Sequence, residues 1–239
     1  MNSQNEEGWG AWPLGAVAFL YTDLKNSTPQ VIDLGDLVYA EAIKDPHYRV
    51  LFEALKLNGG RLISDKGDGI IGVFGSVSEA FAAALQIQKE TADERILNPK
   101  TGKPIGVRIG IHLSQRDAIL LPGHQAGDRP VYSIEALSYA SRVEASAEDG
   151  QIALSASAYR SLNAQISRDY PLFKSLAEWE SAKPKTSIVE WADRDLKGVP
   201  DADALYEVVY EGRKPKELGK LFAPPWMKRE LGLFIGRQE

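Results

Sequence analysis

The stretch GGRLISDKGDGIIGVF, residues 59–74, places a carboxylate in a setting that favours chemistry over packing. Asp68 stands between Gly67 and Gly69, and the flanking residues 61–64 and 70–74 have the composition of two β-strands. This pattern predicts a tight hairpin with Asp68 at its tip, where glycine lets the backbone approach a ligand closely. A carboxylate at such a tip is poorly suited to a core and well suited to holding a metal ion.

A second carboxylate follows a buried segment. Asp23 follows the apolar run VAFLY, residues 17–21, after Thr22, and this run predicts a fully buried central strand. A hairpin beside that strand would bring Asp23 and Asp68 within a few ångströms of each other. Such a pair can hold two divalent cations, the arrangement used for in-line phosphoryl displacement. Taken singly, Asp23 is equally well explained as a helix cap and Asp68 as a turn residue; the pair in this topology favours the metal site.

The surrounding elements follow from hydrophobic periodicity. The pattern predicts helices over 47–57, 136–147 and 155–162, a further helix opened by the capping box Ser76-Val77-Ser78-Glu79, a strand with one buried face over 107–113 to which 119–121 could pair, and strands over 151–155, 188–192 and 204–210. The order strand, helix, strand, strand, helix, strand predicts an α+β fold. It has a ferredoxin-like βαββαβ core with extra C-terminal strands, in which a mostly antiparallel sheet carries its helices on one face.

The composition limits the kinds of partner and site that this chain can have. The 239 residues carry a net charge of −5, which argues against nucleic-acid binding by bulk electrostatics. The absence of cysteine excludes disulfides and thiolate zinc sites. No apolar run approaches the roughly 20 residues of a membrane span, and the acidic start MNSQNEEGW has no signal-peptide pattern, so we expect a cytoplasmic protein without membrane contact. The histidines 47, 112 and 124 lack metal-site spacing, and we expect satisfied structural side chains.

Five motifs in this order and spacing resemble the class III nucleotidyl cyclases, homodimeric catalytic domains that convert nucleoside triphosphates to cyclic monophosphates. They are YTDLKNST (21–28), GGRLISDKGDGIIGVF (59–74), VRIGIHLS (107–114), ALSYASRVEASAEDGQIALS (136–155) and LKGV (196–199). The resemblance implies a cyclase fold and a catalytic domain over residues 15–211, between an N-terminal arm (1–14) and a C-terminal tail (212–239). It also implies a homodimer with composite active sites at its interface.

The resemblance implies roles for individual residues. Asp23 and Asp68 fall on the family's metal-binding aspartates, and the Leu24 carbonyl falls on a backbone ligand of the two Mg²⁺ or Mn²⁺ ions. Arg142 falls on the arginine that stabilises the pentacovalent phosphorus, and Lys197 falls on or near a lysine that touches the triphosphate. The backbone N–H groups of residues 25–28, which include Ser27 and Thr28, open a helix and are well placed to donate hydrogen bonds to phosphate oxygens. The alternative for Arg142 is a surface ion pair with Glu144 or Glu148.

Three positions depart from the purine cyclases of the family. The base-reading lysine is Ser64, the base-reading Asp or Thr aligns with Val131, and the asparagine before the arginine is Ser138. Small side chains there, beside intact metal and phosphate residues, favour a changed base. Candidates to line the base pocket are Arg61, Asp65, Asp128 and Tyr132, although each of them is better explained as a structural or surface residue.

In this respect the chain resembles the pyrimidine cyclases of Pycsar antiphage defence, whose cyclic UMP or cyclic CMP activates a separate effector protein. We therefore expect a pyrimidine substrate, UTP ahead of CTP. In the dimer, Asp23 and Asp68 would come from one subunit and Ser64, Ser138, Arg142 and Lys197 from the other. The alternatives are an adenylate cyclase and a catalytically silent cyclase-like binding module.

Overall fold

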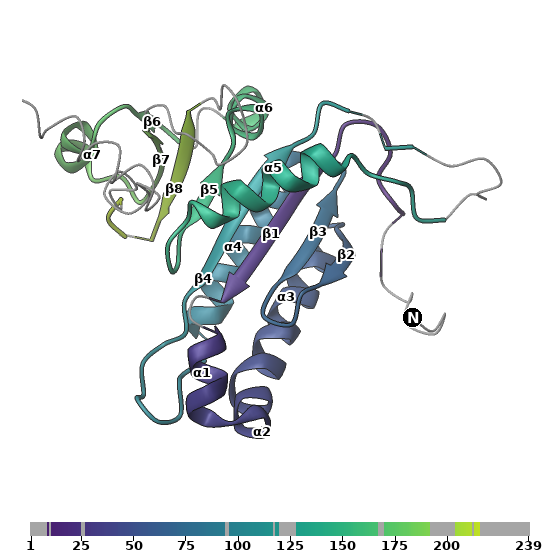
Figure 1. Cartoon of the computed structure of the whole chain (residues 1–239). Coiled ribbons are helices and arrows are strands. Elements are labelled where there is room, and N and C mark those ends of the chain that lie inside the picture. Colours follow the sequence, from purple (N-terminus) through teal and green to yellow (C-terminus); the bar gives the residue numbers. More distant parts are fainter. Residues whose placement is uncertain are drawn as a thin grey trace, which may run out of the picture.

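A computed structural model describes residues 9, 11–24, 27–93, 96–116, 118–119, 128–166, 170–191, 204–211 and 213–215. One eight-stranded sheet with the strand order β2-β3-β1-β4-β5-β8-β7-β6 forms its centre (Figure 1). In chain order the elements are β1 (Ala18–Leu24), α1 (Ser27–Leu34), α2 (Asp36–Tyr39), the π-helical turn η2 (Ala40–Lys44), α3 (Asp45–Leu57), β2 (Arg61–Asp65), β3 (Ile70–Phe74), α4 (Val77–Asp93), β4 (Val107–Leu113), α5 (Ile134–Ala145), β5 (Ile152–Leu154), α6 (Ala156–Ile166), β6 (Leu172–Phe173), α7 (Leu176–Ala182), β7 (Thr186–Trp191) and β8 (Leu205–Tyr210).

The predicted α+β fold with a βαββαβ core is confirmed, and β5 to β8 extend the sheet at its C-terminal side. The strand pairs are antiparallel except β4 with β5 and β6 with β7, which are parallel. The capping box also forms: the Ser76 backbone N–H donates to Glu79 Oε2 at 3.0 Å, and the Glu79 N–H donates to Ser76 Oγ at 3.2 Å.

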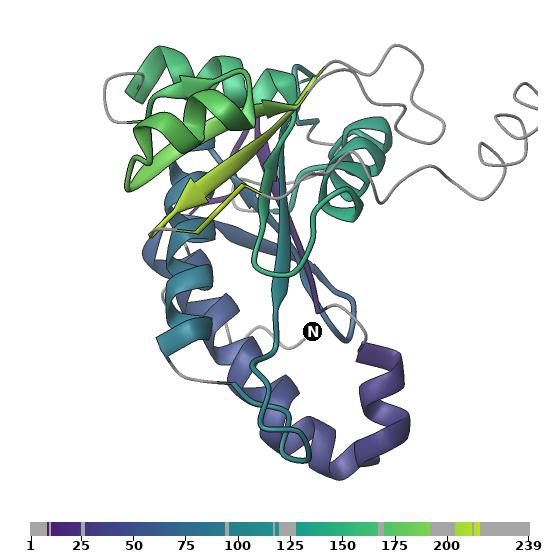
Figure 2. The same ribbon diagram turned by 90° about the vertical axis from the view of Figure 1, so that its left-hand side faces the viewer.

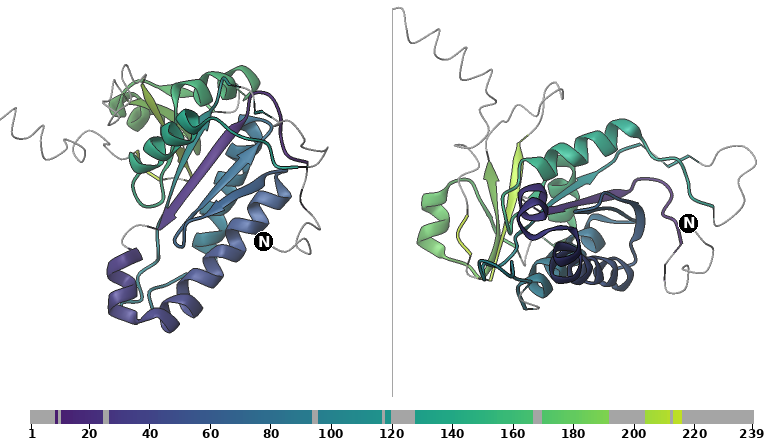
Figure 3. Two further views of the ribbon diagram at one scale, coloured as in Figure 1. Left: turned by 45° about the vertical axis from the view of Figure 1, so that its right-hand side comes forward. Right: turned by 60° about the horizontal axis from the view of Figure 1, so that its bottom comes forward.

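Helices cover both faces of the sheet, so the prediction of helices on one face was wrong. Figure 2 shows α3 and α4 on one side of the strands and α5 on the other, and the right panel of Figure 3 shows the same layers from below. Strand β1 explains this arrangement, because its alternate residues are apolar and buried on both sides. Ala18 and Leu20 join the core under α3 and α4, whereas Phe19 packs with Ala136 and Ala140 of α5.

Two local expectations around β4 also fail. Its second face, expected to be open, lies under α5 at Gly110, where an added Cβ would come 2.2 Å from the Glu144 backbone nitrogen. Ile119 does not pair with β4 but forms an isolated bridge with Val131, and the other two residues of the predicted 119–121 strand lie outside the described residues. Both edges of β4 are already taken, by β1 and by β5, so no hydrogen-bonding edge remains for another strand.

Candidate active site

The turn of the β2–β3 hairpin lies against the end of β1, as the left panel of Figure 3 shows. The Leu24 backbone N–H donates to the Asp68 carbonyl at 3.2 Å, and the Ile70 N–H donates to Thr22 Oγ1 at 3.0 Å. Gly69 makes this approach possible, because a Cβ there would lie 1.8 Å from the Thr22 carbonyl oxygen. The glycine after Asp68 is therefore required by packing against β1. The predicted hairpin with Asp68 in its turn is confirmed.

The Tyr48 side chain of α3 fixes the turn from the other side. Its hydroxyl donates to Asp65 Oδ1 and lies 3.3 Å from the Gly69 carbonyl, and it accepts from the Gly67 N–H at 3.2 Å. Asp65 Oδ1 also accepts from the Gly67 N–H at 2.7 Å. Asp65 is thus occupied in shaping the turn, which favours the structural alternative for this residue over a place in a base pocket.

This geometry brings the Asp23 and Asp68 carboxyl groups together. Burial raises the pKa of Asp23, the Arg108 guanidinium works against that rise, and the Asp68 carboxyl adds to it through its charge and through a side-chain hydrogen bond. Ser27 Oγ at the start of α1 donates to Asp68 Oδ2 at 2.6 Å. The two acids that the sequence singled out, 45 positions apart, therefore share one site.

Arg108 and Glu144 belong to the same cluster, and the sequence reasoning missed both. The Arg108 Nη2 lies 2.5 Å from Asp23 Oδ2, and its Nε forms an ion pair with the buried Glu144 carboxylate. Burial raises the pKa of Glu144 to about 7, against the lowering effect of Arg108. Arg108 alternates with apolar residues along its strand, a pattern that is typical of a solvent-facing position. No signal in the sequence marks its contact with α5.

The donors fit a divalent metal. Among the residues that the structure describes, no group of three or more His, Cys, Asp or Glu side chains could hold an ion by itself. Two adjacent carboxylates with a backbone carbonyl at the end of β1 still match Mg²⁺ or Mn²⁺, which are commonly bound by one or two carboxylates while substrate phosphates supply further ligands. The arrangement is therefore suited to ions that arrive with a phosphorylated substrate.

The three positions at which the sequence departs from the purine cyclases, 64, 131 and 138, lie on the surface or near it. Ser64 is half-buried on β2, beside a register shift in its pairing with β3, and its hydroxyl donates to the Asp65 carbonyl at 3.3 Å. Val131 and Ser138 are exposed. Tyr132, in contrast, is 5% exposed, packs edge-on against Phe19, and donates to the Pro13 carbonyl, so the structural alternative holds for it.

Two residues of α5 point away from the sheet. Ala136, Ala140 and Val143 form the buried face of α5, and Ser138 and Arg142, four positions apart, lie on the opposite face. Glu144 pairs with Arg108, and the Arg142 guanidinium has no ion-pair partner in the described part of the chain. The alternative of an Arg142 ion pair with Glu144 or Glu148 is therefore not what the structure shows. Lys197 lies outside the described residues.

The histidine expectation holds for one residue. His112 Nδ1 lies 3.0 Å from Ser155 Oγ, as expected of a satisfied side chain. His47 is fully buried, but neither ring nitrogen has a hydrogen-bond partner in the part of the chain that the structure describes. His124 lies outside the described residues.

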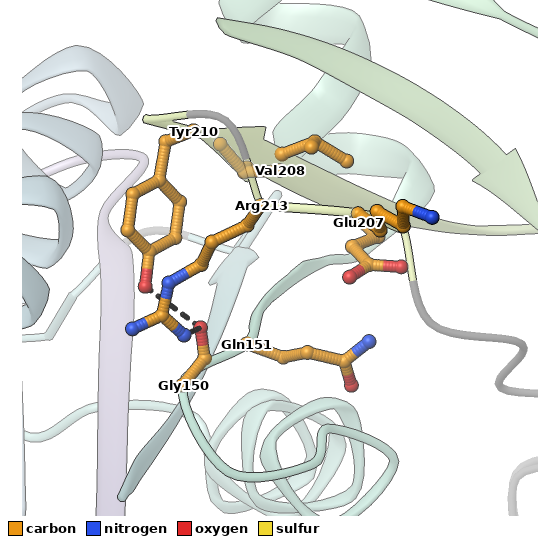
Figure 4. A pocket seen from close by; sticks show the side chains of 8 residues that line it. Gly150, Gln151, Glu207, Val208, Tyr210 and Arg213 are labelled. Carbon is orange, nitrogen blue, oxygen red and sulfur yellow. Dashed lines mark hydrogen bonds between the residues drawn. The ribbon is translucent and has the colours of Figure 1, made fainter. Parts of the chain in front are cut away.

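A cavity of about 200 Å³ lies elsewhere, between the start of β5, the end of β8 and residues 213–214 (Figure 4). Tyr210 Oη and Arg213 Nη1 both donate to the Gly150 carbonyl at its wall, at 2.7 and 3.0 Å. This cavity shares no residue with the carboxylate pair. The candidate site therefore rests on the geometry at the end of β1 and not on this cavity.

Comparison with known proteins agrees with that geometry. A family model described as the adenylate and guanylate cyclase catalytic domain matches residues 13–176, a span that contains Asp23, Asp68 and Arg142. The chain belongs to this family. The nucleotidyl cyclase fold is thus established for it, and the carboxylate pair lies within the matched domain. A search of curated proteins finds no match.

Solved cyclase domains share the fold at low identity. The guanylate cyclase domain of RhGC from Catenaria anguillulae, in complex with GTP, is 18% identical with a TM-score of 0.60, over 82% of this chain and 97% of that one. A Trypanosoma brucei adenylate cyclase in a monomeric state is 19% identical with a TM-score of 0.63, over 84% and 93%. The adenylyl cyclase CyaB from P. aeruginosa is 16% identical with a TM-score of 0.61, over 85% and 98%. In the described part of this cyclase domain, no helix combines the length and apolarity needed to span a bilayer.

Proposed function

We propose that this cyclase domain converts a pyrimidine nucleoside triphosphate, UTP ahead of CTP, to its 3′,5′-cyclic monophosphate and pyrophosphate. The observation that carries the proposal is a contrast within one domain. The Asp23–Asp68 pair is assembled and Arg142 is available, yet small side chains stand at the purine-reading positions 64, 131 and 138. Without long polar side chains there, the pairing with adenine or guanine edges is lost, and a smaller base can be held by hydroxyls directly or through water.

In this mechanism the chain's own residues bind and orient the substrate. Asp23, Asp68 and the Leu24 carbonyl would hold two Mg²⁺ or Mn²⁺ ions, with Ser27 Oγ fixing the Asp68 carboxylate. Bound divalent ions supply a lowered pKa at the ribose 3′-hydroxyl and neutralise charge on the triphosphate. Backbone N–H groups at the start of α1, including those of Ser27 and Thr28, donate to phosphate oxygens.

The remaining groups come from a second copy of the chain. Ser138 and Arg142 lie on the face of α5 turned away from their own sheet, which supports their contributing to the site of a neighbouring subunit. Arg142 then donates through its planar guanidinium to charge that develops at phosphorus, and Lys197 contacts the triphosphate. Ser64 and Val131 face the base. The active protein is a homodimer with two composite sites, and its product signals to a separate effector protein in antiphage defence.

One panel tests the substrate. The purified full chain is incubated with each of the four ribonucleoside triphosphates and Mn²⁺, and the products are identified by mass. Cyclic UMP, with or without cyclic CMP, is expected, and cyclisation of ATP alone would overturn the pyrimidine assignment. Asp68→Asn should abolish turnover, and retained activity in that variant would overturn the metal assignment. Nucleotide binding without pyrophosphate release from any substrate would identify a silent module.

A further inference from the structure

Arg108 is shared between two carboxylates on different elements. Its Nη2 donates to Asp23 Oδ2 on β1 at 2.5 Å, and its Nε forms an ion pair with Glu144 Oε1 on α5 that does not have hydrogen-bond geometry. The exposed fractions of the side chains are 24% for Arg108, 22% for Asp23 and 9% for Glu144. A guanidinium can face both carboxylates at once because its charge is delocalised over a planar group, unlike the point charge of a lysine ammonium.

The backbone fixes this arrangement from both sides. Asp23 and Arg108 are direct partners in the antiparallel β1–β4 register, so their side chains leave the same face of the sheet. Gly110, two residues further along that face, lets α5 come close enough for Glu144 to reach Arg108, since a Cβ at position 110 would lie 2.2 Å from the Glu144 nitrogen. The three charges are thus held by strand register and by helix contact rather than by flexible loops.

Arg108 and a metal ion would compete for the Asp23 carboxylate. The Arg108 guanidinium holds Asp23 Oδ2, and a divalent ion on the same carboxylate would be a second positive charge beside it. Glu144 offers the guanidinium a second carboxylate, and Lys66 and the Asp23–Asp68 pair are the other charged groups that act on Glu144. With Glu144 ionised, Arg108 keeps a counter-ion when it releases Asp23.

We propose that Glu144 is a positioning residue that sets the divalent-ion affinity of the Asp23–Asp68 pair by holding Arg108. The inference rests on the proposed function, because it requires that this pair binds metal. It makes opposite predictions for the two partners. Removing the charge of Glu144 leaves Arg108 with Asp23 as its carboxylate partner and weakens metal binding. Removing the charge of Arg108 frees Asp23 and strengthens metal binding.

The test measures Mn²⁺ binding to the full chain without nucleotide, by electron paramagnetic resonance of free Mn²⁺ and by water-proton relaxation. Glu144→Gln should raise the Kd for Mn²⁺ by roughly 10- to 100-fold, the usual effect of losing an outer partner of a metal ligand. Arg108→Gln should lower the Kd. In the double variant Arg108→Gln/Glu144→Gln, the Glu144 substitution should have no further effect, because Glu144 acts through Arg108.

A matched control comes from the same helix. Glu135 in the first turn of α5 forms an ion pair with Arg116 in which both side chains are more than 70% exposed. Glu135→Gln makes the same change in charge and should leave the Kd unchanged. Arg108→Gln keeps Glu144 in place and tests the proposal even if Glu144→Gln fails to fold.

The outcomes separate the two proposals. If wild type binds Mn²⁺ and Asp68→Asn does not, the metal site stands. In that case an unchanged Kd in Glu144→Gln, or an unchanged or raised Kd in Arg108→Gln, would overturn the role of Glu144. An equal loss of affinity on adding Glu144→Gln to Arg108→Gln would also overturn it, because Glu144 would then act directly on the ion. If wild type and Asp68→Asn bind Mn²⁺ alike, the site and this inference fall together.

Discussion

Gly69 and Thr22 are in backbone contact so close that a single methyl group at position 69 would lie 1.8 Å from the Thr22 carbonyl oxygen. This contact sets the distance between the hairpin and β1, and hence between Asp68 and Asp23. Gly67, on the other side of Asp68, has open space around it, and its φ of +91° is the left-handed conformation that favours glycine. The two glycines of the hairpin tip therefore serve different purposes, one in packing and one in turn conformation.

Gly69→Ala should abolish cyclase activity by pushing the hairpin away from β1. A displacement of about 1 Å in a catalytic group can cost roughly 100-fold in rate, and we expect at least that loss in kcat/KM with Mn²⁺. Gly67→Ala is the matched control: it strains the turn by about 1 kcal/mol but meets no atom, so it should lower the thermal midpoint while keeping most activity. Equal activity losses in the two variants would contradict this account.

Ser27→Ala should weaken the site without unfolding the domain. Ser27 Oγ donates to Asp68 Oδ2 at 2.6 Å, and a hydrogen bond to a charged group contributes about 1.5–3 kcal/mol. We expect kcat/KM to fall by about tenfold and the Mn²⁺ concentration for half-maximal activity to rise. Ser27→Thr keeps the hydroxyl and should retain activity. A drop of the same size in both variants would assign the effect to the start of α1 rather than to this hydrogen bond.

Mixing two inactive variants should restore activity if the sites are composite. Asp68→Asn damages the metal half of each site, and Arg142→Ala damages the half that we assign to the partner subunit. Random exchange makes half of the dimers mixed, and each mixed dimer has one intact site, so about a quarter of wild-type activity is expected. The two proteins are mixed at equal concentration, left to exchange subunits, and then assayed for cyclase activity. No recovery would place both residues in a site formed by one chain.

His47 should make the fold sensitive to acid. Burial lowers its pKa from 6.5 to about 4, so between these values the unfolded chain binds a proton that the folded chain does not. The stability that depends on neutral His47 is fully present above pH 6.5 and is lost as the pH falls from 6.5 through 4. At pH 5 the loss amounts to about 2 kcal/mol. Urea unfolding at pH 7.5 and pH 5 should show that His47→Leu loses less stability than wild type.

The comparison isolates His47 because His112, which is half-buried, stays in both proteins. Burial also lowers the pKa of His112 to about 4, and its contribution cancels in the difference. An identical pH dependence in the two proteins would show that His47 is protonated without cost in the folded state.

Local sequence patterns were enough to predict several parts of this protein. The apolar run before Asp23 required a strand buried on both faces, the glycines around Asp68 required a hairpin tip, and Ser76 with Glu79 fixed the start of α4. These signals are local because φ/ψ preferences, side-chain alternation and capping act over a few residues. Together they were sufficient for the fold class and for the pairing of the two acids.

Other contacts between side chains of different elements could not be predicted in this way and became visible in the folded chain. Arg108 alternates with apolar residues like any solvent-facing strand position, and its contact with Asp23 and Glu144 depends on strand register and on the approach of α5 over Gly110. The helix α5 on the second face of the sheet was not predicted for the same reason, since the sequence of a buried strand does not specify which helix covers it. Contacts between residues far apart in the chain depend on packing, and packing is a property of the whole fold rather than of any segment.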